Sequence, residues 1–434
     1  MVTIRLLRRA GVVAMATAVI LPGVASAHPD PTEGHVHPRP ATPTQQGFEL
    51  LGQANPGTGS NGDVYAFDGF AYLGSWIGQG CLSNGIRVYD LRDPRHPAHV
   101  STFADAASNP ALAGTWTEKV IVERVHTRSF RGVLAAVSFQ ACSSTDTTAF
   151  RGFGVYDVTD PRHPRELSRY AAPGTRGSHE IWLGANNGKA FVYTAIIRSE
   201  LTTSPTFDPA TGDATVPGRA DFRIVDVSNP RRPTDVGEWG AWRELGVKPN
   251  ADGRSNFVHS VRVDDNLQRA YLSYWDLGTV MLDISTPARP RLLGKTTPTQ
   301  GATHSSFVAR DGRLLVETHE TEAGLPVYYD ISRPSQPRQL STFSIDGFET
   351  DTVHDPKVRG NTTFFSWYSF GVVAARSTAP GRPTLRAQFI PDTDYINPDF
   401  FCDQPCAQVW GVALDGGLVL ASDMNSGLYV LRLR

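Results

Sequence analysis

The sequence predicts an all-β protein, a seven-bladed β-propeller of four-stranded antiparallel sheets. Three observations favour this fold. The phrase VYDLRDPRHP at residues 88–97 returns in related form four more times, alternating β-branched and aromatic residues flank each copy, and helical periodicity is nearly absent. Repetition of this kind in a chain of 434 residues indicates an array of like units closed into one large domain.

The repeated phrase predicts a β-hairpin. Each copy is an apolar run, an aspartate, a second apolar residue and then a Pro-x-x-Pro segment, and the later copies occupy residues 155–164, 224–233, 281–290 and 328–337. Asx residues and prolines favour tight turns, because the Asx side chain bonds nearby backbone and proline presets φ. We expect the aspartate of each copy to anchor its turn rather than to do chemistry: Asp90, Asp157, Asp226, Asp283 and Asp330.

Seven units can be completed along the chain. The fourth unit is typical, with strands expected at residues 257–263, 269–275, 279–284 and 291–295. The first strands of the other units are expected at residues 63–67, 119–125, 179–184, 303–309, 353–358 and 407–414. The last unit holds only three strands, and FELLGQ at residues 48–53 resembles the missing outer one, so the ring should be closed by an N-terminal strand in the last blade. One helical turn is expected near residues 242–245.

The N-terminal residues have the pattern of an export signal. An arginine-rich start, an apolar run too short to span a bilayer and a small-residue cleavage site predict a signal peptide at residues 1–27. Residues 28–46 are Pro-rich and polar and predict a disordered linker, which leaves residues 47–434 for the propeller. The export route, general secretory or twin-arginine, stays open. The mature protein is expected to be secreted or held at the cell surface, monomeric, and without a membrane span.

Charge and cysteine content narrow the function classes further. The net charge of −2 offers no basic surface for nucleic acid. Four cysteines in an exported chain favour disulfides. Cys81 and Cys142 occupy matching places in successive units and should pair, and Cys402 should pair with Cys406 in one irregular stretch.

The hairpin phrase resembles the LVIVD repeat of exported bacterial and archaeal β-propeller proteins. The resemblance covers essentially the whole mature chain and implies a fold, but no single reaction. Residues 259–285 (HSVRVDDNLQRAYLSYWDLGTVMLDIS) are also similar to one blade of the selenium-binding proteins. The methanethiol oxidases of that family are copper-dependent propellers, so this similarity would imply a copper ion.

Histidines recur where four successive innermost strands begin. Because all innermost strands of a propeller run the same way along the central channel, equivalent residues should form a ring at one mouth. Imidazole is a common ligand of zinc, copper and iron. The predicted metal ligands, for a divalent or copper ion, are His179, His259, His304 and His354.

The ends of the second strands return to the same mouth and add acids and indoles. Carboxylates orient metal ligands, and indoles offer stacking surfaces. Further ligand-binding residues are expected at this mouth: Glu180, Asp276, His319, Glu320, Asp355, Trp76, Trp275, Trp367 and Trp410. No motif for a catalytic nucleophile or a phosphate loop is present, so catalytic residues are not assigned.

Several interpretations of the histidine ring remain open. Each histidine has a hydroxyl or acid nearby in sequence and could simply pin its own blade. Three functions are compatible with the ring: an exported binding or scaffold protein with a ligand or metal site at the mouth, a metal-dependent and possibly copper oxidoreductase, and a carbohydrate- or peptide-binding protein. Its partner would be a small ligand or an extracellular protein.

Overall fold

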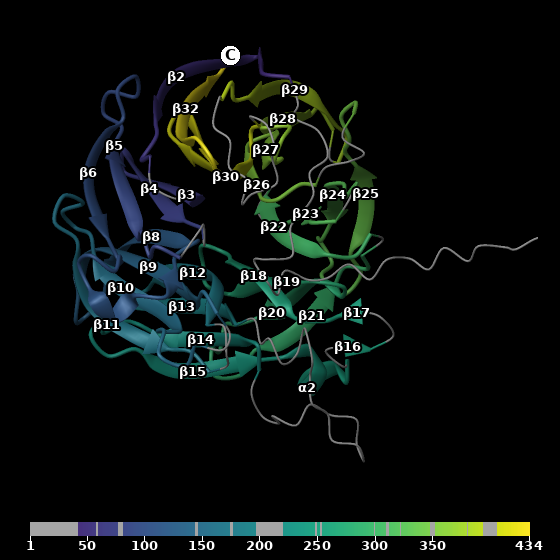
Figure 1. Ribbon diagram of the computed structural model, residues 1–434. Helices are drawn as coiled ribbons and strands as arrows, with labels where there is room; N and C mark the ends of the chain where they lie inside the picture. The colour runs from purple at the N-terminus through teal and green to yellow at the C-terminus, as the bar shows by residue number, and fades with distance from the viewer. Residues whose placement is uncertain are drawn as a thin grey trace, which may run out of the picture.

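Seven four-stranded antiparallel sheets are arranged in a ring, as Figure 1 shows. The structure is a computed structural model that describes residues 42–57, 60–76, 81–143, 146–173, 177–196, 220–247, 250–251, 254–298, 300–309, 312–321, 323–347, 352–379, 381–393 and 406–434. The predicted all-β propeller is confirmed. The predicted signal peptide, most of the predicted linker and Cys402 lie outside these residues.

Each blade runs outward from an inner strand at the channel, in chain order. Blade 1 is β3 (Asn61–Phe67), β4 (Phe70–Ser75), β5 (Ile86–Asp90) and β6 (Ala98–Phe103). Blade 2 is β8 (Val120–His126), β9 (Arg131–Ala141), β10 (Gly152–Asp157) and β11 (Arg165–Ala171). Blade 3 is β12 (Ser178–Asn186), β13 (Lys189–Ile196), β14 (Phe222–Asp226) and β15 (Thr234–Trp239). Blade 4 is β18 (Val258–Val263), β19 (Arg269–Tyr274), β20 (Gly278–Asp283) and β21 (Arg291–Lys295).

The remaining three blades follow the same plan. Blade 5 is β22 (Thr303–Ala309), β23 (Leu314–His319), β24 (Val327–Asp330) and β25 (Arg338–Thr342). Blade 6 is β26 (Pro356–Arg359), β27 (Thr362–Ser366), β28 (Val372–Ser377) and β29 (Pro383–Ile390). Blade 7 is β30 (Val409–Asp415), β31 (Leu418–Asp423), β32 (Gly427–Leu433) and the N-terminal β2 (Phe48–Ala54).

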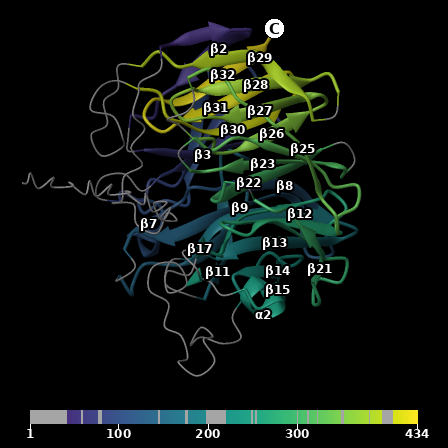
Figure 2. The same ribbon diagram turned by 90° about the vertical axis from the view of Figure 1, so that its right-hand side faces the viewer.

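A few short elements stand outside the plan. β7 (Thr115–Trp116) pairs with the end of β9 and lies at one end of the ring in the side view of Figure 2. β16 (Asn250–Ala251) and β17 (Arg254–Ser255) form a small hairpin. A 3-10 turn spans Pro110–Leu112, and the helical turn expected near residue 242 is α2 (Ala241–Leu245).

Closure of the ring by the N-terminal strand is consistent with the pairing of the terminal strands. β2 pairs antiparallel with β32, so the two ends of the chain complete one sheet. β1 (Thr44–Gln46) adds a strand to the outside of blade 6 by pairing with β29. These three residues fall in the predicted linker, residues 28–46, so that stretch ends in a strand rather than in disordered chain.

Neighbouring blades share apolar cores. Blades 3 and 4, for example, bury Ile224, Trp239, Val261 and Leu272 against one another. A corresponding cluster lies at each of the other six junctions in the described chain. Burial of this kind is the main force holding blade to blade.

The repeated aspartate anchors the turn that follows it, as expected. The Asp90 carboxylate accepts the Arg92 backbone N–H at 3.0 Å, and the other four copies make the equivalent bond: Asp157 to Thr159, Asp226 to Ser228, Asp283 to Ser285 and Asp330 to Ser332. Each is a local Asx-type bond that closes the hairpin.

The Pro-x-x-Pro turn also contacts the blade before it. In blade 1 a β-bulge interrupts the pairing of β5 with β6, and Ser101 beside it donates to the carbonyl of Pro161 in blade 2 at 2.6 Å. Ser168 makes the same 2.6 Å bond to Pro230 of blade 3. At the next two junctions the equivalent residues are Gly237 and Gly294, which lie directly against the Pro287 and Pro334 carbonyls. We call these four contacts the proline latches.

A disulfide joins Cys81 to Cys142, with their Cα atoms 6.2 Å apart, as the sequence analysis expected. Cys406 is also disulfide-bonded, while its predicted partner Cys402 lies outside the described residues, so that pairing stays a prediction. The helices of the described chain include none that is both long and apolar enough to cross a membrane.

Candidate metal site at one mouth of the channel

Irregular pairing at the start of the inner strands determines which side chains face the mouth of the channel. In blades 4, 5 and 7 a bulge between the first and second strands falls at His259, His304 and Trp410 respectively. In blade 3 the irregularity spans His179 and Glu180. A bulge bends its strand and re-aims a side chain, which is how a residue at a strand entrance comes to face its neighbours around the channel.

The four predicted histidines lie side by side. Ring centroids are 4.4 Å apart for His179 and His259, 4.1 Å for His259 and His304, and 4.1 Å for His304 and His354. Trp410 continues the row at 4.0 Å from His354. All five side chains are buried. The row therefore spans blades 3 to 7 along one side of the mouth.

Hydrogen bonds fix which imidazole nitrogen faces inward. The Nδ1 atom of His259 lies 3.2 Å from the His304 carbonyl oxygen, and Nδ1 of His304 lies 2.8 Å from that of His354. A backbone carbonyl only accepts, so both Nδ1 atoms carry the proton and both Nε2 atoms present a lone pair. This is the tautomer that a metal-binding imidazole requires.

One cluster on the row has the geometry of a ligand set. His259, His304 and Glu320 each offer one ligand atom, and these atoms lie within 4.8 Å of one another. Glu320 directly follows β23, and its Oε2 is 3.5 Å from Nε2 of His304. Tyr368 donates its hydroxyl to the other oxygen of Glu320. The three residues are between 1% and 3% exposed, so an ion held there would be shielded from solvent.

His179 abuts this cluster. Its Nε2 lies 2.9 Å from Nε2 of His259, while its Nδ1 lies 2.5 Å from Oε1 of Gln140. If both Nδ1 atoms hold protons, the two Nε2 atoms meet lone pair to lone pair, an arrangement that a shared proton or a bound cation relieves. Two ligands of one tetrahedral zinc ion would lie about 3.3 Å apart, close to this spacing.

His354 lies between His304 and Trp410 in the same row. Neither of its ring nitrogens has a hydrogen-bond partner among the described residues, and the side chain is fully buried. Burial, helped by His304, holds its pKa well below the usual value, so the ring is neutral. Buried polar atoms are normally satisfied, and those that are not point to water or an ion.

Glu118 occupies the mouth position of blade 2. Its Oε1 accepts the indole N–H of Trp410 at 3.0 Å, and its Oε2 is 3.4 Å from Nδ1 of His179. Burial, together with the Glu180 carboxylate, raises its pKa well above the usual value. Glu118 thus links the two ends of the histidine and tryptophan row.

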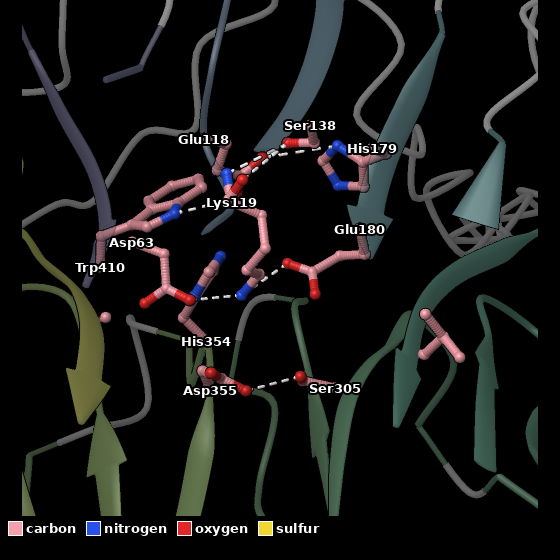
Figure 3. Close-up of polar contacts among 12 residues, drawn as sticks. Asp63, Glu118, Lys119, Ser138, His179, Glu180, Ser305, His354, Asp355 and Trp410 are labelled. Carbon is pink, nitrogen blue, oxygen red and sulfur yellow. Dashed lines mark hydrogen bonds and ion pairs between the residues drawn. The ribbon is translucent and has the colours of Figure 1, made fainter. Parts of the chain in front are cut away.

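A layer of paired charges lies next to the histidine row, further along the inner strands. Lys119 extends between Asp63 and Glu180, with Nζ 2.7 Å from Oε1 of Glu180 (Figure 3). Arg262 bridges Glu180 at 3.3 Å and Asp355 at 3.2 Å. Asp355 also contacts Lys357 and accepts from Ser305 at 2.6 Å. Three cations and three carboxylates balance in this layer.

The pKa values of the layer follow from its pairing. Burial alone would neutralise these groups, but the neighbouring carboxylates raise the pKa of Lys119, and Lys119 and Arg262 lower that of Glu180. Burial is likewise outweighed at Asp355, where Lys357, Arg262 and Lys119 hold the pKa well below its usual range. Glu180 and Asp355, expected as ligand-binding residues, are therefore occupied as ion-pair partners beneath the histidine row.

The remaining expected acid, Asp276, and the fifth histidine, His319, are held by local bonds. Asp276 accepts the backbone N–H groups of Ser255 at 2.7 Å and Ala302 at 3.1 Å, which joins two loops. His319 is buried between the Leu325 carbonyl at 3.0 Å and the Glu317 carboxylate at 3.2 Å. Neither is part of the cluster formed by His259, His304 and Glu320.

The tryptophans divide between the mouth and the blade cores. Trp76 lies 4.4 Å from both Trp116 and Trp410, and Trp275 lies 5.2 Å from His259 and stacks on Phe257. Trp367 packs on Phe343 and Phe365 instead. The four expected indoles are at most 7% exposed, so little of any ring face is presented to a ligand in this arrangement.

The chain was compared with protein-family models, with curated proteins and with solved structures. The model of the LVIVD repeat family matches residues 216–239 and 260–297, within blades 3 and 4. The chain thus carries LVIVD repeats in these two blades, and its fold is a seven-bladed β-propeller, as the resemblance implied. No curated protein matches its sequence. Among solved structures, the Raptor protein of Chaetomium thermophilum is similar to this propeller, with a TM-score of 0.56 and 12% sequence identity. That match covers 90% of this chain but only 30% of Raptor, and at this identity it concerns the fold alone.

Proposed function

We propose that this LVIVD-repeat propeller is an exported protein that binds a transition-metal ion at one mouth of its channel. One observation carries the proposal: the ligand atoms of His259, His304 and Glu320 converge in a buried cluster. Two imidazoles and a carboxylate suit zinc, copper or iron rather than calcium or magnesium, which prefer oxygen ligands.

The bonding of the histidines supports a ligand role over simple pinning. Histidines that pin their own blade would bond acids or hydroxyls of that blade. Here His259 and His304 donate from Nδ1 to carbonyls of the next blade, while their Nε2 atoms face the cluster. In each ring, Nδ1 therefore bonds the neighbouring blade and Nε2 would bind the metal. The Nδ1 bond fixes the orientation and the tautomer that metal binding at Nε2 requires.

The surrounding residues would define the site chemically. Tyr368 orients Glu320, and the balanced layer around Lys119 and Arg262 adds no net charge that would repel a cation. A bound ion would supply Lewis acidity and, if it were copper or iron, one-electron chemistry. Because the ligand residues are buried, only small molecules would reach a bound ion.

Export is supported by two features. The N-terminal residues have a signal-peptide pattern, and the Cys81–Cys142 disulfide is typical of oxidising compartments. LVIVD-repeat proteins are typically found outside the cytoplasm, in agreement with both.

A copper-dependent oxidoreductase is the second candidate, because aromatic rings adjoin the site. Trp410 lies 4.0 Å from His354, and Trp76 and Trp116 continue the contact outward at 4.4 Å per step. Such a row could carry single electrons. Consumption of dioxygen by the copper-loaded protein with a small thiol as reductant would favour this candidate over a binding protein.

The binding proposal is tested by titrating chelator-treated protein with Zn²⁺ and Cu²⁺ in a calorimeter. We expect one ion per chain, and a loss of affinity of at least about 100-fold in the His259→Ala/His304→Ala variant. Tyr368→Phe should weaken binding by about 10-fold, because it removes only the bond that orients Glu320.

The matched control is His96→Ala/His163→Ala, which removes two exposed histidines from the repeated turns. It should bind metal like the wild type, and all variants should keep the wild-type circular dichroism spectrum. Equal metal binding by the wild type and the His259→Ala/His304→Ala variant would contradict the proposed site.

A further inference from the structure

The disulfide between Cys81 and Cys142 lies beside the aromatic side chains that adjoin the histidine row. Both cysteines pack against one buried cluster, which we call the aromatic cover: Trp76, Trp116, Tyr368, Trp410 and Met424. Within this cover, Tyr368 donates its hydroxyl to the proposed metal ligand Glu320. The disulfide is therefore in contact with side chains that touch the proposed metal site.

The disulfide also holds the short strand β7 in place. β7 pairs over only two residues, with the last two residues of β9. Cys142 is the next residue after β9, and its backbone N–H donates at 2.9 Å to the carbonyl of Gly114, which precedes β7. On the other side of β7, Sγ of Cys81 lies 3.3 Å from the Thr115 carbonyl oxygen. Because so short a pairing is hardly stable by itself, the covalent link beside it keeps β7 on the mouth.

These tied segments orient His179. Gln140, two residues before Cys142, has its Oε1 2.5 Å from Nδ1 of His179. Trp116 of β7 packs edge-on against the same imidazole, with the ring centroids 6.2 Å apart. Nε2 of His179 in turn lies 2.9 Å from Nε2 of His259, a proposed metal ligand. A displacement of β7 and the end of β9 would thus reach the metal site through a single side chain.

The two disulfides of the chain differ in their accessibility. Cys81 and Cys142 are both partly exposed, whereas Cys406 of the other disulfide is only 5% exposed. Thiol–disulfide exchange begins when a thiolate attacks a disulfide sulfur, so it depends on access to that sulfur. An external thiol therefore reaches the disulfide at the mouth more readily than the buried one.

We propose that the Cys81–Cys142 disulfide is a redox switch that regulates release of the metal ion. The inference rests on the proposed function, because the ion is the one held by His259, His304 and Glu320. In the oxidised protein the disulfide keeps β7 and the end of β9 on the histidine row, and the ion is retained. In the reduced protein these segments open locally, the imidazole beside the ion loses its fixed orientation, and the ion leaves faster.

The reductant is a dithiol. One of its thiolates attacks a sulfur of the disulfide, the S–S bond breaks, and a mixed disulfide forms while the other cysteine leaves as a thiolate. The second thiol of the reductant then displaces the first cysteine. Two electrons and two protons pass to the protein, which gains two thiols, and the dithiol becomes a disulfide.

The test compares zinc release from the oxidised and the reduced mature chain. Chelator-treated protein is reduced with dithiothreitol, separated from it under nitrogen and loaded with Zn²⁺, and a parallel sample stays oxidised. Stopped-flow mixing with a chromophoric chelator gives the rate of release. We expect release at least about tenfold faster after reduction, as for loss of a contact that orients a ligand. Cys81→Ser/Cys142→Ser should release zinc at the faster rate with or without dithiothreitol treatment, which excludes the second disulfide and the new thiols as the cause.

Amide hydrogen exchange of the metal-free protein provides an independent measurement. Reduction should speed exchange in β7 and at the end of β9 and leave the other blades unchanged. The switch is overturned if oxidised and reduced protein release zinc equally fast, or if exchange rises throughout the ring, which would make the disulfide a global staple. Failure of the proposed function is distinguishable: neither form would then retain zinc, and the switch would fall with it.

Discussion

The charged state of single side chains at the centre of this propeller depends on their immediate partners. Lys119 and Glu180 are each about 2% exposed, yet both are charged, because each is paired with ions on two sides. Taking a charge out of water costs several kcal/mol, and only such pairing offsets it. The layer therefore tolerates rearrangement poorly and separates the two mouths of the channel.

Some of the residues at the channel could be predicted from the sequence, and others could not. Histidines at four equivalent strand starts predicted a shared location, and their rings do lie in one row. Lys119 and Arg262 were not singled out. A bulge at the strand entrance shifts the alternation by one residue, so Ser260 and then Arg262, rather than Val261, follow His259 on the channel side.

Replacing Lys119 by methionine tests the energetic importance of the layer. The change leaves Asp63 and Glu180 buried without their shared cation, and should lower the free energy of unfolding by about 3–5 kcal/mol in urea denaturation. Arg124→Met is the control, because it breaks an exposed pair with Asp68 and should cost at most about 1 kcal/mol. Similar losses in the two variants would show that the buried pairing is not special.

At the level of strands and turns, the repeated phrase has two functions. Its aspartate closes the hairpin, and its first proline carbonyl docks on the preceding blade through a proline latch. The hairpins and their aspartates were predictable from composition. The latches were not, because they join residues of different blades, between 40 and 62 positions apart, and depend on a bulge in the outer strand. The small residue in HVSTF, ELSRY, DVGEW and RLLGK is the trace they leave in the sequence.

Gly237→Ala tests a latch directly. A Cβ atom at this position would overlap the Pro287 carbonyl oxygen, so blades 3 and 4 would have to separate. We expect the free energy of unfolding to fall by about 1–3 kcal/mol, as for other overpacked sites. Gly417→Ala is the control, since a Cβ there would meet nothing within 4 Å, and it should stay within about 0.5 kcal/mol of wild type. A neutral Gly237→Ala would remove the steric basis of the latch.

For the whole molecule, ring closure depends on the two ends of the chain. The count of seven blades followed from the repeats, and the missing strand of the last one predicted β2 beside β32. The added strand β1 was not foreseen, because its short polar sequence has no strand pattern and only pairing with β29 orders it. Both pairings cover an outer edge that would otherwise be open.

Stepwise truncation measures what closure contributes. A chain starting at residue 42 keeps both strands and should melt like the longer mature form. Removing β1 should lower the melting temperature slightly. Removing β2 as well exposes the edge of β32 and deprives blade 7 of the buried Phe48, so we expect a clearly lower melting temperature and aggregation seen by light scattering. An unchanged melting curve without β2 would show that this strand is not needed to hold the ring closed.

Anomalous X-ray diffraction would locate a metal ion at the mouth of the channel. Crystals of the protein loaded with zinc or copper would be measured on both sides of the metal absorption edge. We predict one strong anomalous peak bonded to His259, His304 and Glu320, with metal–nitrogen distances of about 2.0–2.1 Å. A fully loaded crystal whose peaks lie elsewhere, with no density between these three residues, would rule out the metal site.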